Sequence, residues 1–237
     1  MIRLRAIAVF VCMCIASSAQ AQSVGSLFTS LPADFAHLFT PVNGIIAGIG
    51  GAGSAAVHPT DDEIAAHIYQ ASGSTHDVFH AGAGIGDGTT QAGFALATYI
   101  AGRASHHAGL GQLGADLVDA QIVNGVLTQG LKTAVDRRRP TGSKHSFPSG
   151  HTSATLATAS VIQEHYGWKM AAPFYALGGY VSISRLVDNQ HWASDVIFGA
   201  AIGIVSGRAA SFRHGQRVSV SPSLLPGGFT VNGSIWR

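Results

Sequence analysis

The sequence predicts an all-α helical bundle that ends in a small C-terminal β-hairpin. Between residues 61 and 211, apolar side chains recur at three- and four-residue spacing, as they do on one face of an α-helix. Beyond residue 21, no candidate helix offers the ~18 continuous apolar residues, free of proline and repeated glycine, that a membrane span needs. We therefore expect a soluble single-domain bundle, the alternative being a polytopic protein whose short apolar helices enter the lipid.

Residues 1–21 have the composition of a secretory signal peptide. Met1–Arg5 carries two arginines, Ala6–Ala16 is apolar, and Ala19-Gln20-Ala21 has the small-x-small pattern of a cleavage site. We expect export to the periplasm or another extracytoplasmic location after cleavage before Gln22, with an uncleaved N-terminal anchor as the alternative. Both cysteines, Cys12 and Cys14, lie in this segment, so the mature chain would have no thiol for a disulfide or a metal.

Residues 22–60 form a lead-in rich in glycine and alanine. Glycine as dense as in Gly44–Gly51 lowers helix stability, because each glycine loses much backbone entropy when it is ordered. We expect this stretch to be irregular or to contact a lipid surface.

The helical domain is predicted to span residues 61–213. Asp61-Asp62-Glu63 places negative charge at a helix start, where the helix dipole favours it. The clearest periodicity belongs to residues 114–136, where six apolar residues recur at three- and four-residue spacing. The segments predicted to be helical are 61–72, 89–104, 114–136, 150–166, 170–186 and 191–211.

Residues 214–237 are predicted to form the hairpin. Val218 and Val220 alternate with serines, Leu224–Gly228 contains a Pro-Gly-Gly turn, and the apolar residues that follow alternate again.

Charge divides the chain into two halves. Residues 22–131 have eight acidic residues and one basic residue, whereas residues 132–237 have eleven basic and four acidic ones. The two halves cancel, so we expect no general attraction to polyanions, and the basic residues match no nucleic-acid-binding module. A local positive field in the second half suits a phosphorylated substrate.

Lys132 and Arg139-Pro140 form the first polar cluster. Two residues seven positions apart are only about 20° from being aligned on a helix, so both cations are predicted to project from one face of a helix end that Pro140 terminates. Such a pair suits a phosphate dianion, or else complements the dipole at a helix C-terminus. Arg137 and Arg138 are predicted to point elsewhere and to be solvated.

Pro148-Ser149-Gly150-His151 forms the second cluster. It precedes a plausible helix start, where free backbone N–H groups bind phosphate oxygens and glycine allows a close approach. His151 would then lie beside the anion. The alternative is a helix cap with a bystander histidine.

Ser184-Arg185, His191 and Asp195 form the third cluster. His191 and Asp195 are one helical turn apart, so the carboxylate can fix the tautomer of the ring and leave the other nitrogen free to attack. Arg185 can reach the same anion with its planar guanidinium. A structural His–Asp pair is the alternative.

Together the three clusters resemble the three signature motifs of the type 2 phosphatidic acid phosphatase superfamily. That superfamily also includes bacterial acid phosphatases and vanadium-dependent haloperoxidases. The resemblance spans about residues 61–212 and matches every signature position. The gap of seven residues between Pro140 and Pro148 leaves little room for an insertion that would cap the substrate.

The resemblance implies a helical bundle that cleaves phosphomonoesters without a cofactor or metal. His191 would be the nucleophile that forms a phosphohistidine, with Asp195 orienting it and His151 acting as acid and then base. The phosphate-binding residues would be Lys132, Arg139, Ser149, Gly150 and Arg185.

The expected substrate is a phosphorylated lipid or small molecule, and contact with a membrane would be peripheral. The alternatives are a vanadate-dependent haloperoxidase, for which the chain is short, and a non-enzymatic envelope protein that binds anions.

Overall fold

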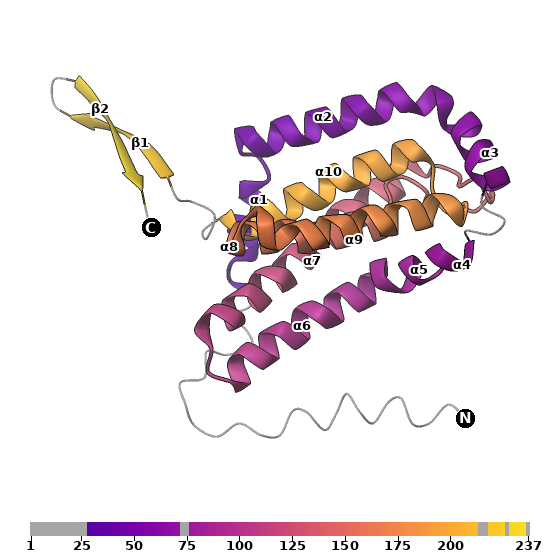
Figure 1. Ribbon diagram of the computed structural model, residues 1–237. Coiled ribbons are helices and arrows are strands. Elements are labelled where there is room, and N and C mark those ends of the chain that lie inside the picture. The colour runs from indigo at the N-terminus through magenta and orange to yellow at the C-terminus, as the bar shows by residue number, and fades with distance from the viewer. Residues whose placement is uncertain (1–27, 72–75, 213–217, 226–227, 236–237) are drawn as a thin grey trace.

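The computed structural model describes residues 28–71 and 76–212, together with the backbone of two strands at 218–225 and 228–235. The predicted signal peptide lies outside the described residues. The described body is helical (Figure 1). Its elements are α1 (Leu31–His37), α2 (Pro41–Val57), η3 (His58–Thr60), α3 (Asp61–Ala71), α4 (His76–Phe79), α5 (Ala81–Gly86), α6 (Gly88–Ala104), α7 (Ala108–Val135), α8 (Gly150–Tyr166), α9 (Trp168–Val187) and α10 (Ala193–Ala210).

All six predicted helices are present, with the largest boundary shift at α7. This helix begins at Ala108, six residues before its predicted start, and His107 caps it by accepting the backbone N–H of Leu110 at 3.1 Å. Glycines in this first part allow close packing against α6, since a Cβ at Gly114 would collide with the backbone of Tyr99. Tertiary packing here overrides the poor helix propensity of glycine.

The predicted irregular backbone of the lead-in is wrong, whereas its alternative, contact with a lipid surface, stays a prediction. Pro41–Val57 forms the 17-residue helix α2, which Thr40 caps through its side chain. Gly50 lets this helix touch α10, because a Cβ at that position would overlap the side chain of Ala201. Ser54 also donates a hydrogen bond to the Ser194 carbonyl at 2.9 Å. The predicted boundary at residue 60 therefore does not separate α2 from the bundle.

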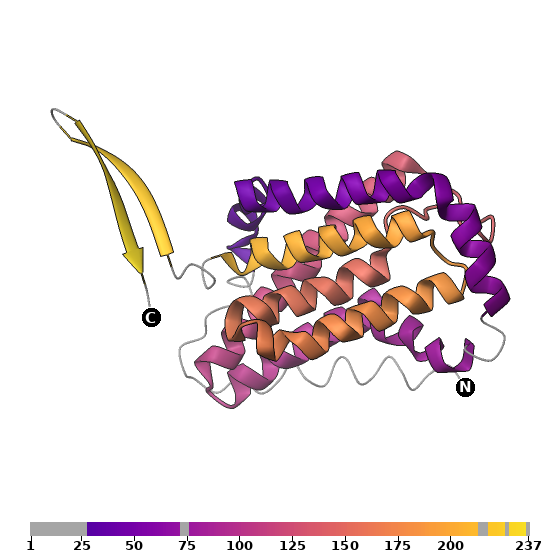
Figure 2. The ribbon, with the colours of Figure 1, turned by 45° about the horizontal axis from the view of Figure 1, so that its top comes forward.

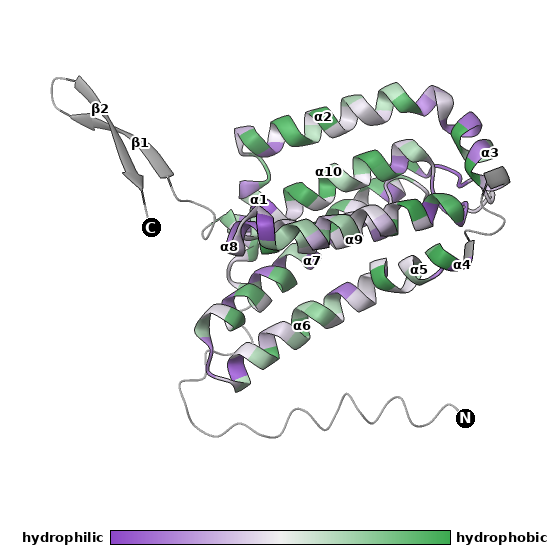
Figure 3. Cartoon of the chain, viewed as in Figure 1, coloured by the Kyte–Doolittle hydropathy of each residue, from purple (hydrophilic) through white to green (hydrophobic). Residues whose placement is uncertain are grey.

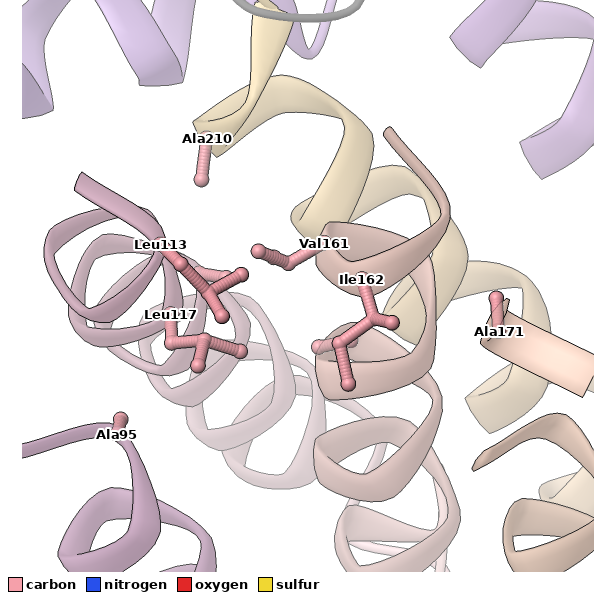
Figure 4. Close-up of a cluster of buried hydrophobic side chains, with 9 residues drawn as sticks. Ala95, Leu113, Leu117, Val161, Ile162, Ala171 and Ala210 are labelled. Carbon is pink, nitrogen blue, oxygen red and sulfur yellow. The ribbon is translucent and has the colours of Figure 1, made fainter. Parts of the chain in front are cut away.

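Four helices lie side by side in the order α2, α10, α8 and α9 (Figure 2). The long helix α7 packs against α8 and α10 from the other side, and α6 covers α7. The core contains Leu113 and Leu117 of α7 facing Val161 and Ile162 of α8, with Ala210 of α10 nearby (Figure 4).

Helices α8 and α10 approach each other closely through glycine. A Cβ at Gly199 would lie 2.7 Å from the Ser149 carbonyl oxygen, and one at Gly203 would overlap the carbonyl of Ser153. Because the backbones nearly touch, the start of α8 is held against the start of α10. This contact fixes the relative positions of the second and third polar clusters.

Helix α10 is long and apolar enough to cross a membrane. Its 18 residues have a mean hydropathy of 1.3, and 61% of this stretch is buried inside the bundle. Among the described residues, α1 and the segment Pro41–Tyr69 pass the same test as one pair bent by 63°. Hydrophobic residues recur along both α2 and α10, interrupted by hydrophilic ones (Figure 3). The core helix of a soluble protein meets the same criteria.

Strands β1 (Val218–Leu225) and β2 (Gly228–Ile235) pair in antiparallel register. The register runs from Val218 opposite Ile235 to Leu225 opposite Gly228. The hairpin predicted for residues 214–237 falls in this part of the chain.

Candidate active site

The three predicted clusters meet at one end of the bundle, where α7 and α9 end and α8 and α10 begin. In Figure 2 this is the right-hand end. The contributing residues are Lys132 in the last turn of α7, Arg139 in the following loop, Ser149, Gly150 and His151 at the start of α8, Arg185 in the last turn of α9, His191 just before α10, and Asp195 in the first turn of α10.

His191 and Asp195 form a buried pair. The imidazole Nδ1 lies 3.6 Å from Asp195 Oδ2, and the side chains are 3% and 0% exposed. The predicted reason for this contact is wrong, because His191 precedes α10 and is not one turn away on it. The pair forms because Asp195 folds back over the helix start and accepts the backbone N–H of Trp192 at 2.9 Å.

The Asp195 carboxylate is ionised in this setting. Burial by itself would raise its pKa, but interactions with His191, the Ser146 hydroxyl, the Trp192 N–H and Arg137 outweigh burial and lower the pKa below its usual value. Ser146 donates to Asp195 Oδ2, the oxygen that faces the imidazole. The carboxylate is thus held as an anion beside Nδ1 of His191.

His191 is an uncharged ring at neutral pH. Burial lowers its pKa, Asp195 opposes that change, and the positive charges of Lys132 and Arg139 lower the pKa further. A neutral imidazole whose Nδ1 faces a carboxylate leaves Nε2 with a free lone pair. That nitrogen can act as a nucleophile.

His151 is the second ring in the site. Burial lowers its pKa to about 4, and the charge of Arg185, the ring of His191 and the charge of Arg139 contribute to the shift. Only Asp87 raises the pKa among the main contributors. A bound dianion would reverse this balance and favour the protonated ring.

Lys132 is held by backbone oxygens of the loop before α8. Its Nζ donates to the carbonyl of His145 at 2.8 Å and to that of Pro148 at 2.7 Å. Burial and the nearby Arg139 lower its pKa to about 8. Lys132 thereby fixes the loop and supplies a positive charge next to Gly150. A Cβ added at Gly150 would lie 3.7 Å from Cε of Lys132.

The prediction that Lys132 and Arg139 project from one helix face is wrong. Helix α7 ends at Val135, and Asp136 adopts a left-handed backbone conformation with a φ of 44°. The chain therefore turns before Arg139, which returns to the site from the loop and donates to Gln190 Oε1 at 2.6 Å. The loop, and not helical periodicity, brings the two cations together.

Two arginines have donors to spare. Within the described residues, Nε of Arg139 and Nε of Arg185 are buried without a hydrogen-bond partner. Arg185 also pairs through NH2 with Asp188. Buried guanidinium donors are normally satisfied, so this arrangement is suited to an anion that accepts from both.

Arg137 is a functional candidate that the sequence analysis missed. It was predicted to be solvated, yet its side chain is 18% exposed and donates to Asp195 Oδ1 at 2.7 Å and to Asp61 Oδ2 at 2.7 Å. Asp61 was singled out only as a helix start. The signal in the sequence is weak, because nothing in the local pattern distinguishes Arg137 from its neighbour Arg138.

A cavity of about 490 Å³ leads away from Lys132 and His151 between α6, α7 and α8. Apolar and small side chains predominate in its walls. The lining residues are Gly88, Ala92, Leu96, Val118, Gln121, Ile122, Asn124, Gly125, Thr128, Gln129, Lys132, Gly150, His151 and Ala154.

No group of three or more metal-binding side chains occurs in the described part of the chain. The donors around the candidate site are cationic or imidazole groups that suit an anion, in keeping with the three clusters described above.

Comparisons with known proteins agree with this geometry. Residues 114–217 match the family model of the PAP2 superfamily. The lipid A 1-phosphatase of Porphyromonas gingivalis is 40% identical over 98 residues, which is 39% of this chain and 21% of that protein. The chain thus spans about a fifth of the length of this relative.

Two solved structures share the fold. The crystal structure of Aquifex aeolicus LpxE has a TM-score of 0.54 at 22% identity, covering 63% of this chain and 93% of that one. The transmembrane PAP2 type phosphatidylglycerolphosphate phosphatase from Bacillus subtilis has a TM-score of 0.57 at 18% identity, covering 80% and 94%. The three motifs thus converge at one end of a helical fold that these structures share, and residues 114–217 of the chain match the PAP2 superfamily.

Proposed function

We propose that this protein is a metal-independent phosphatase that hydrolyses phosphomonoesters, with a lipid-linked phosphate as its substrate, through a phosphohistidine intermediate. The observation that carries the proposal is the buried imidazole of His191, which lies 3.6 Å from the Asp195 carboxylate and whose pKa is lowered by burial and by the positive charges of Lys132 and Arg139. This combination supplies a nucleophile and the charges that stabilise its target.

In the first step, Nε2 of His191 attacks phosphorus, the N–P bond forms and the bond to the ester oxygen breaks. Lys132, Arg139 and Arg185 stabilise the negative charge on the equatorial oxygens, as do backbone N–H groups at the start of α8. Bound phosphate raises the pKa of His151, so this ring gives its proton to the leaving oxygen.

In the second step, His151 takes a proton from water and the resulting hydroxide attacks phosphorus. The P–N bond breaks, and inorganic phosphate and neutral His191 are regenerated. Asp195 stabilises the charge that the His191 ring carries while it is phosphorylated. No step requires a metal or a redox partner.

The cavity supports a lipid-linked substrate. It begins at Lys132 and His151 and continues along apolar residues such as Leu96, Val118 and Ile122, so a phosphate at the site would place its ester chain against them. The relatives that act on lipid A or phosphatidylglycerolphosphate support the same substrate class. We further propose that the protein is exported and matures by cleavage before Gln22, which N-terminal sequencing of the mature protein would test.

The test is phosphate release by the purified protein in excess EDTA. The panel contains dodecyl phosphate, diacylglycerol phosphate, a lipid A 1-phosphate, an isoprenyl pyrophosphate and a sugar phosphate. We expect turnover of the lipid-linked esters, inhibition by vanadate, and an alkali-stable phosphoprotein after rapid quenching. Loss of activity in EDTA that returns with added zinc or magnesium would overturn the mechanism, as would halide oxidation by the vanadate-loaded protein in place of phosphate release.

The nucleophile is tested by two substitutions and one control. His191→Ala is expected to abolish turnover, and Asp195→Asn to lower kcat by about 10²–10⁴-fold while the protein remains folded. The control is His67→Gln, which changes an exposed histidine on α3. A folded His191→Ala protein with wild-type phosphate release would refute the proposal.

A further inference from the structure

The loop after α7 joins the candidate dyad to a second carboxylate far away in the sequence. We infer that Arg137 and Asp61 are positioning residues that hold the Asp195 carboxylate in the orientation that faces His191. This inference rests on the proposed phosphatase function. It assigns a catalytic purpose to the start of α3, which lies outside the residues matched by the family.

Arg137 lies between two acids. Its NH1 donates to Asp195 Oδ1 and to the Ser194 hydroxyl, each at 2.7 Å. Its NH2 donates to Asp61 Oδ2 at 2.7 Å and approaches His58 Nδ1 at 2.9 Å. One planar guanidinium therefore fixes both carboxylates relative to each other.

Asp61 also fixes the helix that carries Asp195. Its Oδ1 accepts the backbone N–H of Ser194 at 3.0 Å, and its Oδ2 accepts the Ser194 hydroxyl at 2.5 Å. The first turn of α10 is thus held from the side by a residue that belongs to α3. The contacts of Arg137, Asp61 and Ser194 form a closed ring.

The two oxygens of Asp195 have separate partners. Oδ1 is taken by Arg137, while Oδ2 faces His191 and accepts from Ser146 and from the Trp192 N–H. Since Asp195 is 0% exposed, an oxygen released by Arg137 would have no water to bind. The carboxylate would then rotate or take up a proton, and either change weakens its hold on Nδ1 of His191.

The backbone of the loop makes the arrangement rigid. The Ser146 N–H donates to the Arg137 carbonyl at 2.9 Å, so the two residues whose side chains hold Asp195 are also tied to each other. The guanidinium carbon of Arg137 lies 5.4 Å from the centre of the Trp192 ring, an additional cation–π contact. Arg137 has few conformations open to it.

The charge balance agrees with this geometry. Arg137 contributes to the lowered pKa of Asp195, after the larger effects of burial, His191, Ser146 and the Trp192 N–H. For Asp61, burial raises the pKa, and Arg137 is the largest of the contacts that together lower it. Both acids therefore remain anionic beside one cation.

The experiment compares Arg137→Lys, Asp61→Asn and the control Arg138→Lys. Arg138 is the exposed neighbour of Arg137, and its side chain donates only to the Gly142 carbonyl at 3.4 Å among the described residues. Hydrolysis of dodecyl phosphate is measured as kcat and KM from pH 4 to 9, with circular dichroism and a melting temperature for each variant.

We expect Arg137→Lys to lower kcat by about 10–100-fold and to change KM by less than about threefold, because Arg137 contacts Asp195 and not the substrate. Asp61→Asn should have a smaller effect in the same direction. In Arg137→Lys the pKa of Asp195 should rise, because the guanidinium that donates to Oδ1 is lost. Activity that requires the carboxylate is then lost at a higher pH, and the acid limb of the profile moves upward.

A purely structural role predicts a different result. It would lower the melting temperature and the active fraction while leaving kcat per folded molecule and the acid limb unchanged, and that outcome overturns the inference. If Arg137→Lys does not fold, Asp61→Asn retains the contact between Arg137 and Asp195 and decides the question by kcat per folded molecule at an unchanged KM. Failure of the proposed function is distinct, since the wild-type and Arg138→Lys proteins would then both be inactive.

Discussion

The backbone N–H of Ser149 donates to the backbone carbonyl of Asp195 at 3.0 Å. This bond joins the helix start that carries His151 to the helix start that carries the Asp195 carboxylate. His151 and His191, the ring that Asp195 faces, would act on one phosphorus atom, and the spacing of the two helix starts that position them is set by the main chain. The approach is permitted because position 199 on α10 is glycine.

Gly199→Ala should separate the two helix starts. The added Cβ would lie 2.7 Å from the Ser149 carbonyl oxygen and 3.2 Å from its nitrogen. Overpacking of this kind costs about 1–3 kcal/mol, which is expected to exceed the gain of about 1 kcal/mol from better helix propensity. We expect a lower melting temperature and a fall in kcat of at least about tenfold.

The control for this substitution is Gly179→Ala, at an exposed position on α9 where a Cβ would meet nothing within 4 Å. It should leave kcat unchanged and keep or slightly raise the melting temperature. Equal behaviour of the two alanine variants would show that close backbone contact does not set the geometry of the site.

The pKa of Lys132, about 8, predicts an alkaline limit to activity. As the pH rises through this value the ammonium loses its proton, and with it the attraction for a phosphate dianion. The kcat/KM profile reports the free enzyme and should fall with a midpoint near pH 8. Lys132→Arg keeps its charge, so its profile should lose this limb, whatever its absolute rate. A wild-type profile that stays flat to pH 9.5 would contradict the assignment.

His151 should take up a proton when phosphate binds. In the free site its pKa is about 4, so the ring is neutral at pH 6. A bound dianion favours the imidazolium, and we expect the pKa to rise by at least about one unit. NMR titration of labelled histidine, with His151→Asn to assign the signal, measures this value with and without inorganic phosphate. A His151 pKa that is the same with and without saturating phosphate would argue against the role.

Gly125→Leu should block the cavity. Gly125 lines it, and a Cβ at this position would meet nothing within 4 Å, so a leucine side chain has room to extend into the space. We expect KM for dodecyl phosphate to rise at least about tenfold, with less than a twofold change for phenyl phosphate.

Gly130→Leu is the matched control for the cavity. It lies on the same helix, is exposed and is equally free of close neighbours, but it does not line the cavity. Its kinetics should match those of the wild type with both substrates. If both leucine variants discriminate equally between long and short esters, the cavity does not hold the ester chain.

The sequence predicted the helices of the second half well because their apolar periodicity is undisturbed. The prediction failed at α2, because its glycines suggested irregular backbone. In the structure Gly50 instead allows α2 to pack closely on α10. Likewise, Lys132 and Arg139 were paired for the wrong reason, since a left-handed residue at Asp136 ends the helix and no local pattern announces it. Arg137 was missed because its partners, Asp61 and Asp195, are distant in sequence, and only the tertiary structure shows that it binds them.

The participation of Asp61 changes what counts as the smallest working unit of this protein. A fragment cut to residues 114–217 would retain every residue of the three sequence motifs. It would nevertheless lack α6, one wall of the cavity, and the carboxylate that anchors Arg137. Minimal versions of the protein for engineering should therefore begin upstream of α2, because Ser54 of α2 and Asp61 of α3 both bind the first turn of α10, which carries Asp195.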